Sequence, residues 1–375
     1  MTTKTPADRV RGAAAWTAVA ATVPYLTLKL LWLTGHQVGV DDPAEMDKLW
    51  LVNLLTFGMD AIAVLLALSF VRPWGRRAPA GLLAFPMWVA TGLLGTILVA
   101  LPLSALATLL FGAEKAPGGG SGNQGPGGLD DWVFVVVYGG FSVQGLALIT
   151  AFLLYAGRRW AGLLRSRIGD LPDSPTLTLQ RSLSGVAAVL ALGVAAARGY
   201  WAAGGATGLP VLFAEERSRS VAVLDGVIAV MAVAAVTALL ALVFRARPER
   251  RLRVPLVVAW TAAGSLFGWG SWQLVVFGTV TDVTDPRKAV PGLMPLVETA
   301  QLLTGLLVLV VGAIALVERA AAHATTDGTA TDGTAGDGTA AAARAGTRGA
   351  QAPAARTTTP RSTVARTTAA VESAG

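Results

Sequence analysis

The stretch 221–244, VAVLDGVIAVMAVAAVTALLALVF, is followed at once by the arginine-rich segment RARPERRLR of residues 245–253. About 20 predominantly apolar residues in an α-helix cross the roughly 30 Å of hydrocarbon in a bilayer. The stretch has this length, contains Asp225 as its one charged residue, and ends in cations that suit a headgroup region. It predicts a membrane-spanning helix.

Further stretches share this length and character: 14–34, 49–71, 82–110, 132–156, 183–204, 255–278 and 294–317. Hydrophobic residues make up 53% of the chain and charged residues 14%, about half the charged share of a soluble domain. We therefore predict an all-α, polytopic integral membrane helical bundle of eight transmembrane helices. Its expected parts are a cytoplasmic N-terminus over 1–13, the eight-helix transmembrane domain over 14–321 and a disordered cytoplasmic tail over 322–375, which contains the near-repeat TDGTATDGTAGDGTA.

The loops alternate in charge, and the alternation predicts the orientation. Loops on the side of the N-terminus hold 16 basic and four acidic residues, whereas the opposite loops hold six basic and eleven acidic ones. Short basic loops stay in the cytoplasm, so we expect both termini there. Arg outnumbers Lys 25 to 5, which indicates a high-GC bacterial genome and hence a bacterial plasma membrane. The net charge of +7 is explained by these loops and predicts no nucleic-acid partner.

The two halves of the predicted bundle, 14–157 and 183–319, resemble each other. Each has an even number of spans, so a duplication would give two parallel four-helix repeats. The alternative is chance, because Trp at interfaces and Gly in membrane helices are common. The matching features are Lys29, Trp32 and Gly35 with Arg198, Trp201 and Gly204; Trp88 and Gly92 with Trp260 and Gly264; Asn53 with Asp225; and Gln144 with Gln301.

Few charged or amide side chains lie inside the predicted spans. A charged side chain at the centre of a membrane helix costs about 2.5–3.5 kcal/mol, so such residues usually have a partner or a task. Most of them lie in the outer third of the bilayer, and Asp60 and Gln144 lie nearer the midplane. The set comprises Lys29, Asn53, Asp60, Gln144, Arg198, Asp225, Gln273, Glu298 and Gln301.

One interpretation is a polar cavity that opens outward and contacts a small polar solute or ion. Its candidate ligand-binding residues are Asp60, Lys29, Arg198, Asp225, Glu298, Asn53, Gln144 and Gln301. The alternative is structural: the two cations extend to the interface, and Asp225 and Glu298 cap helix N-termini. Asp60 stands apart, since at mid-helix it either pairs with Lys29 or Arg198, or binds a proton or another cation.

Glycines in the seventh span predict a close helix contact. Gly264 and Gly268, followed by Gly270, form a small-residue face that lets another helix approach. We expect that helix to belong to the same chain, with a dimer seam as the alternative; the oligomeric state itself is not indicated.

Most catalytic chemistry is excluded by residue type. The chain has no cysteine, and its two histidines, His36 and His323, lie outside the apolar stretches. Phosphate loops, zinc-protease motifs and the serine-hydrolase elbow are missing from the sequence. We therefore expect no enzyme, no cofactor and no metal site, with the bilayer and a small solute or ion as partners.

Two resemblances bear on function. The segment PYLTLKLLWLTG of residues 24–35 resembles uncharacterised multi-pass membrane proteins of high-GC bacteria, which implies no particular activity. The pair Asp41–Asp42, in the first external loop, is similar to the acidic pair of polyprenyl-phosphate-dependent membrane glycosyltransferases. Three functions are thus open: solute or ion binding or transport, a structural or assembly role in which buried charges pair helices, and the glycosyltransferase.

Overall fold

The computed structural model describes residues 5–40, 50–112, 124–125, 129–215, 217–280 and 293–345. The chain forms two compact units, Met1–Arg319 and Ala320–Gly375, each treated by itself. Regular structure in the described residues is almost wholly helical. The long helices are α1 (Pro6–Leu33), α3 (Trp50–Ser69), α5 (Ala80–Phe111), α6 (Asp131–Arg159), α8 (Leu177–Ala202), α10 (Arg219–Val243), α11 (Arg253–Val280) and α12 (Leu293–Ala345).

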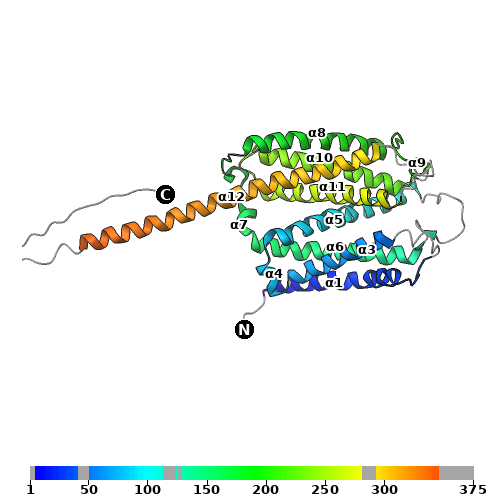
Figure 1. The fold of residues 1–375 in the computed structure, drawn as a ribbon, viewed down its shortest axis with the longest axis horizontal. Helices are drawn as coiled ribbons and strands as arrows, with labels where there is room; N and C mark the ends of the chain where they lie inside the picture. The colour runs from blue at the N-terminus through cyan, green and yellow to red at the C-terminus, as the bar shows by residue number, and fades with distance from the viewer. Residues whose placement is uncertain are drawn as a thin grey trace, which may run out of the picture. The chain divides into compact units, whose positions relative to one another are not determined.

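Short elements connect the long helices. They are α4 (Pro73–Arg77), α7 (Ala161–Arg165), the 3₁₀ turn η1 (Ile168–Asp170), α9 (Val211–Glu215), and the two-residue strands β1 (Gln124–Gly125) and β2 (Leu129–Asp130). The strands pair antiparallel, with Gln124 opposite Asp130. Helices α4 and α7 lie at one end of the first unit and α9 at the other, which we name the α4 end and the α9 end (Figure 1).

Seven helices within the described residues are long and apolar enough to cross a membrane: α1, α3, α5, α6, α8, α10 and the part of α12 up to Ala322. This supports the prediction of an all-α, multi-pass membrane protein. The eighth expected span, 255–278, is helical as α11 but is not one of the seven. Its tryptophans, glycines, serines and Gln273 make it less apolar than the other long helices.

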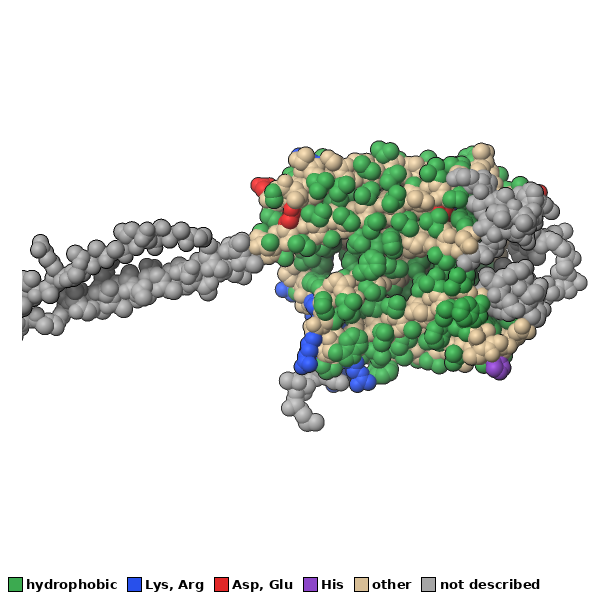
Figure 2. Space-filling model, viewed as in Figure 1, with side chains coloured by type: hydrophobic (Ala, Val, Ile, Leu, Met, Phe, Trp, Pro, Cys, Tyr) green, Lys and Arg blue, Asp and Glu red, His purple; other side chains and the backbone are tan. Residues whose placement is uncertain are grey.

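The flank of the first unit is covered by apolar side chains (Figure 2). Large hydrophobic residues stand far out of the bundle, among them Val189, which is 71% exposed, and Val230, which is 66% exposed. Water would disfavour so much apolar surface, whereas lipid tails would not. The exposed flank and the long helices therefore fit the same environment.

Long helices pack in two groups, with α5 and α11 between them (Figure 1). In the N-terminal group α1 contacts both α3 and α6, and in the C-terminal group α10 contacts both α8 and α11. Two separate apolar cores result, one built around Leu148 and Phe152 and the other around Ile228 and Leu239. Helix α5 joins the groups because it also packs on α11 and α10.

Glycines set how closely α5 and α11 approach. A Cβ on Gly92 would overlap the backbone carbonyl of Gly264, and a Cβ on Gly264 would lie 2.5 Å from the Trp88 carbonyl oxygen. One turn further along, the Thr96 and Ser265 hydroxyls are 2.6 Å apart, so the crossing is tied by a buried hydrogen bond. The small-residue face predicted for the seventh span thus packs within the chain, as Gly268 against Leu93 also illustrates.

The C-terminal tail differs from expectation over part of its length. Helix α12 continues to Ala345, although disorder was expected from residue 322. Alanine, which has the highest helix propensity, is frequent in this segment and favours continuation of the helix. Residues 346–375 and most of the glycine-rich linker 116–128 lie outside the described residues, but Gln124 and Gly125 of that linker pair with β2.

Candidate polar network between the helices

Two corners at the α9 end have the same local structure. The indole Nε1 of Trp32 donates a hydrogen bond of 2.9 Å to the Val38 carbonyl, six residues further along. The indole Nε1 of Trp201 donates one of 3.0 Å to the Thr207 carbonyl, again six residues further along. Glycines at matching positions take positive φ in both corners: Gly35 and Gly39 (86° and 69°), and Gly204 and Gly208 (97° and 83°).

A buried cation precedes each tryptophan by three residues. In the N-terminal group this cation is Lys29, which is fully buried, and its Nζ lies 2.9 Å from Oδ2 of Asp60 on α3. The same Nζ lies 3.9 Å from the centroid of the Tyr25 ring, a cation–π contact. Of the alternatives for Asp60, the structure shows pairing with Lys29. Extension of Lys29 to the interface is not observed.

In the C-terminal group the cation is Arg198, which is 4% exposed and bonds to three other side chains. Its Nη1 lies 2.6 Å from Oδ1 of Asp225, and its Nη2 donates to Oε1 of Glu298. Its Nε and Nη2 also donate to Oε1 of Gln301, at 3.2 and 3.0 Å. All three guanidinium nitrogens are thus engaged, and the Gln301 amide in turn donates to the Leu266 carbonyl at 3.3 Å.

The network extends to a second arginine, Arg217, whose Nη2 donates to Oδ2 of Asp225. We name Arg217, Asp225, Arg198, Glu298 and Gln301 together the Arg198 network. It joins α8, α10 and α12 to the segment before α10, and its formal charges cancel, with two guanidiniums and two carboxylates. Arg217 forms its most exposed part, with 12% of the side chain accessible, whereas the Glu298 side chain has none.

Two polar atoms of the Arg198 network are buried without a hydrogen-bond partner in the described part of the chain. They are the acceptor Oε2 of Glu298 and the donor Nε of Arg217. Leaving a buried acceptor or donor unpaired costs about 1–3 kcal/mol, and more for a charged group. Such atoms are therefore places where a further polar partner would be stabilised.

The predicted single cavity is not observed among the described residues. Lys29 and Asp60 form one cluster between α1 and α3, whereas Arg198, Asp225, Glu298 and Gln301 form another between α8, α10 and α12. Each cation instead reaches the carboxylates of its own helix group. Sequence position alone could not separate these clusters, because all of these residues except Asp60 have similar depths in their helices.

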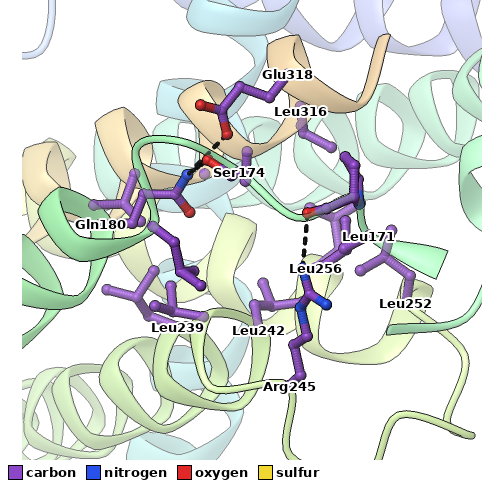
Figure 3. A pocket seen from close by; sticks show the side chains of 16 residues that line it. Leu171, Ser174, Gln180, Leu239, Leu242, Arg245, Leu252, Leu256, Leu316 and Glu318 are labelled. Atoms are coloured by element: carbon purple, nitrogen blue, oxygen red, sulfur yellow. Dashed lines mark hydrogen bonds between the residues drawn. The ribbon is translucent and has the colours of Figure 1, made fainter. Parts of the chain in front are cut away.

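The cavities found in the described residues lie elsewhere. One of about 50 Å³, room for a few water molecules, lies at the α4 end between α8, α10, α11 and α12 (Figure 3). Its wall is mainly leucine, and its polar rim is satisfied: Glu318 accepts from Gln180 at 3.0 Å, and Arg245 donates to the Pro172 carbonyl at 2.7 Å. A second, open hollow lies near Phe111. Neither is lined by the Arg198 network.

The remaining candidates are spread over the bundle. Asn53 and Gln273 are half-buried on α3 and α11, and Gln144 is buried on α6. The capping interpretation of Asp225 and Glu298 is wrong, because each lies in the second turn of its helix. Ser218 caps α10 instead, and its hydroxyl accepts from the Val221 amide at 3.3 Å.

Sequence reasoning missed Arg217 and the hydrogen bonds at the α5–α11 crossing. Arg217 was assigned to an external loop, and nothing in its spacing points to Asp225. The Trp260 Nε1 donates to the Thr91 hydroxyl at 2.9 Å, a pairing that only the close approach of the two helices makes possible.

Other features give no support to a catalytic centre. The part of the chain that the structure describes contains no group of three or more His, Asp or Glu side chains able to hold a metal ion. The acidic pair Asp41–Asp42 lies outside the described residues. No protein-family model, curated protein or solved structure matches the chain.

Proposed function

We propose that the chain is an eight-span bacterial plasma-membrane protein made of two parallel four-helix halves, with both termini in the cytoplasm. The α4 end is then cytoplasmic and the α9 end external. Support comes from the charge alternation of the loops and from the matching corners around Trp32 and Trp201. The contact of Gly92 with Gly264 adds to it, because matching residues of two parallel repeats meet where the halves cross.

Cysteine labelling should test this orientation without background, since the chain contains no native cysteine. Single replacements Ser121→Cys and Ser218→Cys should react in intact cells with a maleimide that does not cross membranes. Ser174→Cys and Ser373→Cys should react only after the cells are opened. Labelling of Ser174→Cys in intact cells would contradict the eight-span arrangement.

We further propose that the protein binds a small polar solute at the Arg198 network. The observation that carries this proposal is Oε2 of Glu298, a fully buried carboxylate oxygen without a partner among the described residues. The orphaned Nε of Arg217 lies at the other end of the same chain of ion pairs. A hydroxyl-bearing solute both donates and accepts hydrogen bonds, so it could satisfy either atom.

Charge balance favours a neutral solute over an ion. The two guanidiniums and two carboxylates of the Arg198 network already cancel, and adding an ion would leave a net charge in a buried region. An uncompensated buried charge is costly, whereas a hydrogen-bonded neutral group is not. Polyols, sugars and small amides are therefore the proposed class, and transport rather than static binding would require the solute to leave on the other side.

Comparison of the two halves supports placing the solute in the C-terminal one. Matching Gln144 with Gln301 puts Phe141 where α12 carries Glu298. Phe141 packs edge-on against Tyr25, with ring centroids 4.9 Å apart. The N-terminal half thus surrounds its cation largely with aromatic rings, while the C-terminal half has acquired a second carboxylate at this place.

Isosteric substitutions in the two halves should separate binding from helix pairing. We expect polyols, sugars or small amides to raise the unfolding temperature of the purified wild-type protein, by mass action on the folded state. E298Q should abolish this rise, because the amide presents donors where the solute needs an acceptor. D60N, the matched change in the other half, should keep the rise although it weakens the Lys29 pair.

Three outcomes would overturn the solute proposal. They are an equal rise in wild type and E298Q, a rise caused by alkali salts instead of neutral solutes, and no rise with any solute of the panel.

The second candidate is a structural or assembly protein whose buried charges only pair helices. The observation that favours it is that neither cavity in the described residues reaches the Arg198 network. Under this candidate E298Q and D60N would both lower stability, and no solute would bind. An enzyme remains the third candidate, and an Asp41/Asp42 double alanine variant with unchanged function would eliminate it.

A further inference from the structure

At the α4 end, a short turn presents arginines outward from the N-terminal half. Helix α4 contains Trp74, Arg76 and Arg77, and Arg72 precedes it. All three arginines are exposed, and Trp74 is 45% exposed. Figure 2 shows Lys and Arg side chains gathered along this end of the first unit.

The backbone of this turn is held firmly against the bundle. A Cβ on Gly75 would overlap the Ser69 carbonyl, so only glycine allows this approach. The Tyr155 hydroxyl donates to the Gly75 carbonyl at 3.1 Å, and Nη2 of Arg159 donates to the Ala78 carbonyl at 3.1 Å. Helix α6 therefore fixes the turn from inside, and the outward side chains are displayed on a rigid support.

The outward arginines lack acidic neighbours in the described residues. None of Arg72, Arg76 and Arg77 takes part in a described ion pair. Asp8, the acidic residue described at this end of the N-terminal half, is already engaged by Arg11 at 3.1 Å and by Arg158. By contrast, Arg245 of the C-terminal half pairs with Asp173 at 3.0 Å. The positive charge of the turn is thus left for an external partner.

Apolar surface lies directly beside these charges. The Arg72 guanidinium lies 6.0 Å from the ring of Trp16, which is 51% exposed on α1. At the start of α5, Leu82 is 66% exposed and Phe85 is 48% exposed. A ligand that fits must combine an anion with a long apolar part, which describes an anionic phospholipid better than an acidic peptide or a soluble anion.

We propose that the α4 turn binds the phosphate headgroup of an anionic phospholipid through Arg72, Arg76 and Arg77, with its acyl chains along the exposed faces of α1 and α5. Guanidinium groups suit this task because they donate paired hydrogen bonds to phosphate oxygens. Trp74 would lie at the level of the headgroups, where its ring is favoured. The proposal is independent of the solute proposed for the Arg198 network, at the other end of the unit.

Native mass spectrometry of the detergent-purified full chain tests this site, with phosphatidylglycerol and phosphatidylcholine of the same acyl chains as probes. Wild type should retain phosphatidylglycerol preferentially. Each basic residue near an anionic surface raises affinity about fivefold, so R76Q/R77Q should weaken this retention about 25-fold. The matched control R250Q/R251Q removes two exposed arginines near Glu249 in the C-terminal half and should change retention less than about twofold.

Further arms make every outcome decisive. Inorganic phosphate at millimolar concentration should not displace the lipid; displacement would assign the site to free phosphate and overturn the proposal. Equal losses in R76Q/R77Q and R250Q/R251Q would show only general attraction to basic loops and would also overturn it. If R76Q/R77Q is not recovered folded, R76Q and R77Q singly should each weaken retention about fivefold, and no loss in either would contradict the site.

Discussion

Replacing Arg198 by alanine should lower the free energy of unfolding by about 3–5 kcal/mol, the largest effect expected of any single substitution here. The guanidinium holds Asp225, Glu298 and Gln301 together, and Asp225 and Glu298 are buried carboxylates. Removing it leaves one of them without its cation and the other paired only with Arg217, in a region that lipid keeps dry. The variant should be recovered from membranes at a small fraction of the wild-type level.

Thermal unfolding of detergent-purified protein, followed by fluorescence-detected size exclusion, measures this loss. Arg181→Ala is the matched control, because Arg181 lies on the same helix but is exposed. It should change the unfolding temperature little. Equal stability of Arg198→Ala and Arg181→Ala would show that the Arg198 network does not hold α8, α10 and α12 together.

Gly92→Ala should destabilise the protein by about 3 kcal/mol, at the upper end of the usual cost of overpacking. The added Cβ would overlap the backbone of Gly264, and a backbone atom cannot rotate away as a side chain can. Helices α5 and α11 would have to separate, which would also stretch the hydrogen bond between Thr96 and Ser265.

Gly95→Ala offers a control with the same chemical change on the same helix. Its Cβ would meet only the methyl group of Thr261, at 3.8 Å, which is an ordinary contact. This substitution should be neutral, or stabilising by up to about 1 kcal/mol through helix propensity. If the unfolding temperatures of the two variants agree, α5 and α11 do not cross at Gly92.

The helices could be predicted from sequence because the signal for a membrane span is local. Length and apolar content decided seven of them, and each boundary shifted by only a few residues where α12 is not concerned. Helix α11 is the exception in apolar content, since residues that permit close packing, such as Gly264 and Gly268, are less apolar than those that face lipid. The alanine-rich end of α12 was missed because disorder was inferred from composition alone.

The partners of buried charges could not be predicted in the same way. Lys29 and Asp60 are 31 residues apart, and Arg198 and Glu298 are 100 apart, so their pairing depends on which helices become neighbours. The sequence did identify these residues as unusual, because a charge inside an apolar stretch is costly. It could not indicate that they form two clusters, or that Glu298 keeps one oxygen without a partner.

The central claim is that Glu298 binds a neutral solute, and infrared difference spectroscopy tests it most directly. Membranes containing wild type, E298Q or D60N would be perfused with the polyol, sugar or amide that most raises the wild-type unfolding temperature. We predict a solute-induced change in the carboxylate bands of wild type that persists in D60N and vanishes in E298Q. A change that persists in E298Q, or no carboxylate change in wild type, would contradict the claim and leave helix pairing as the role of the network.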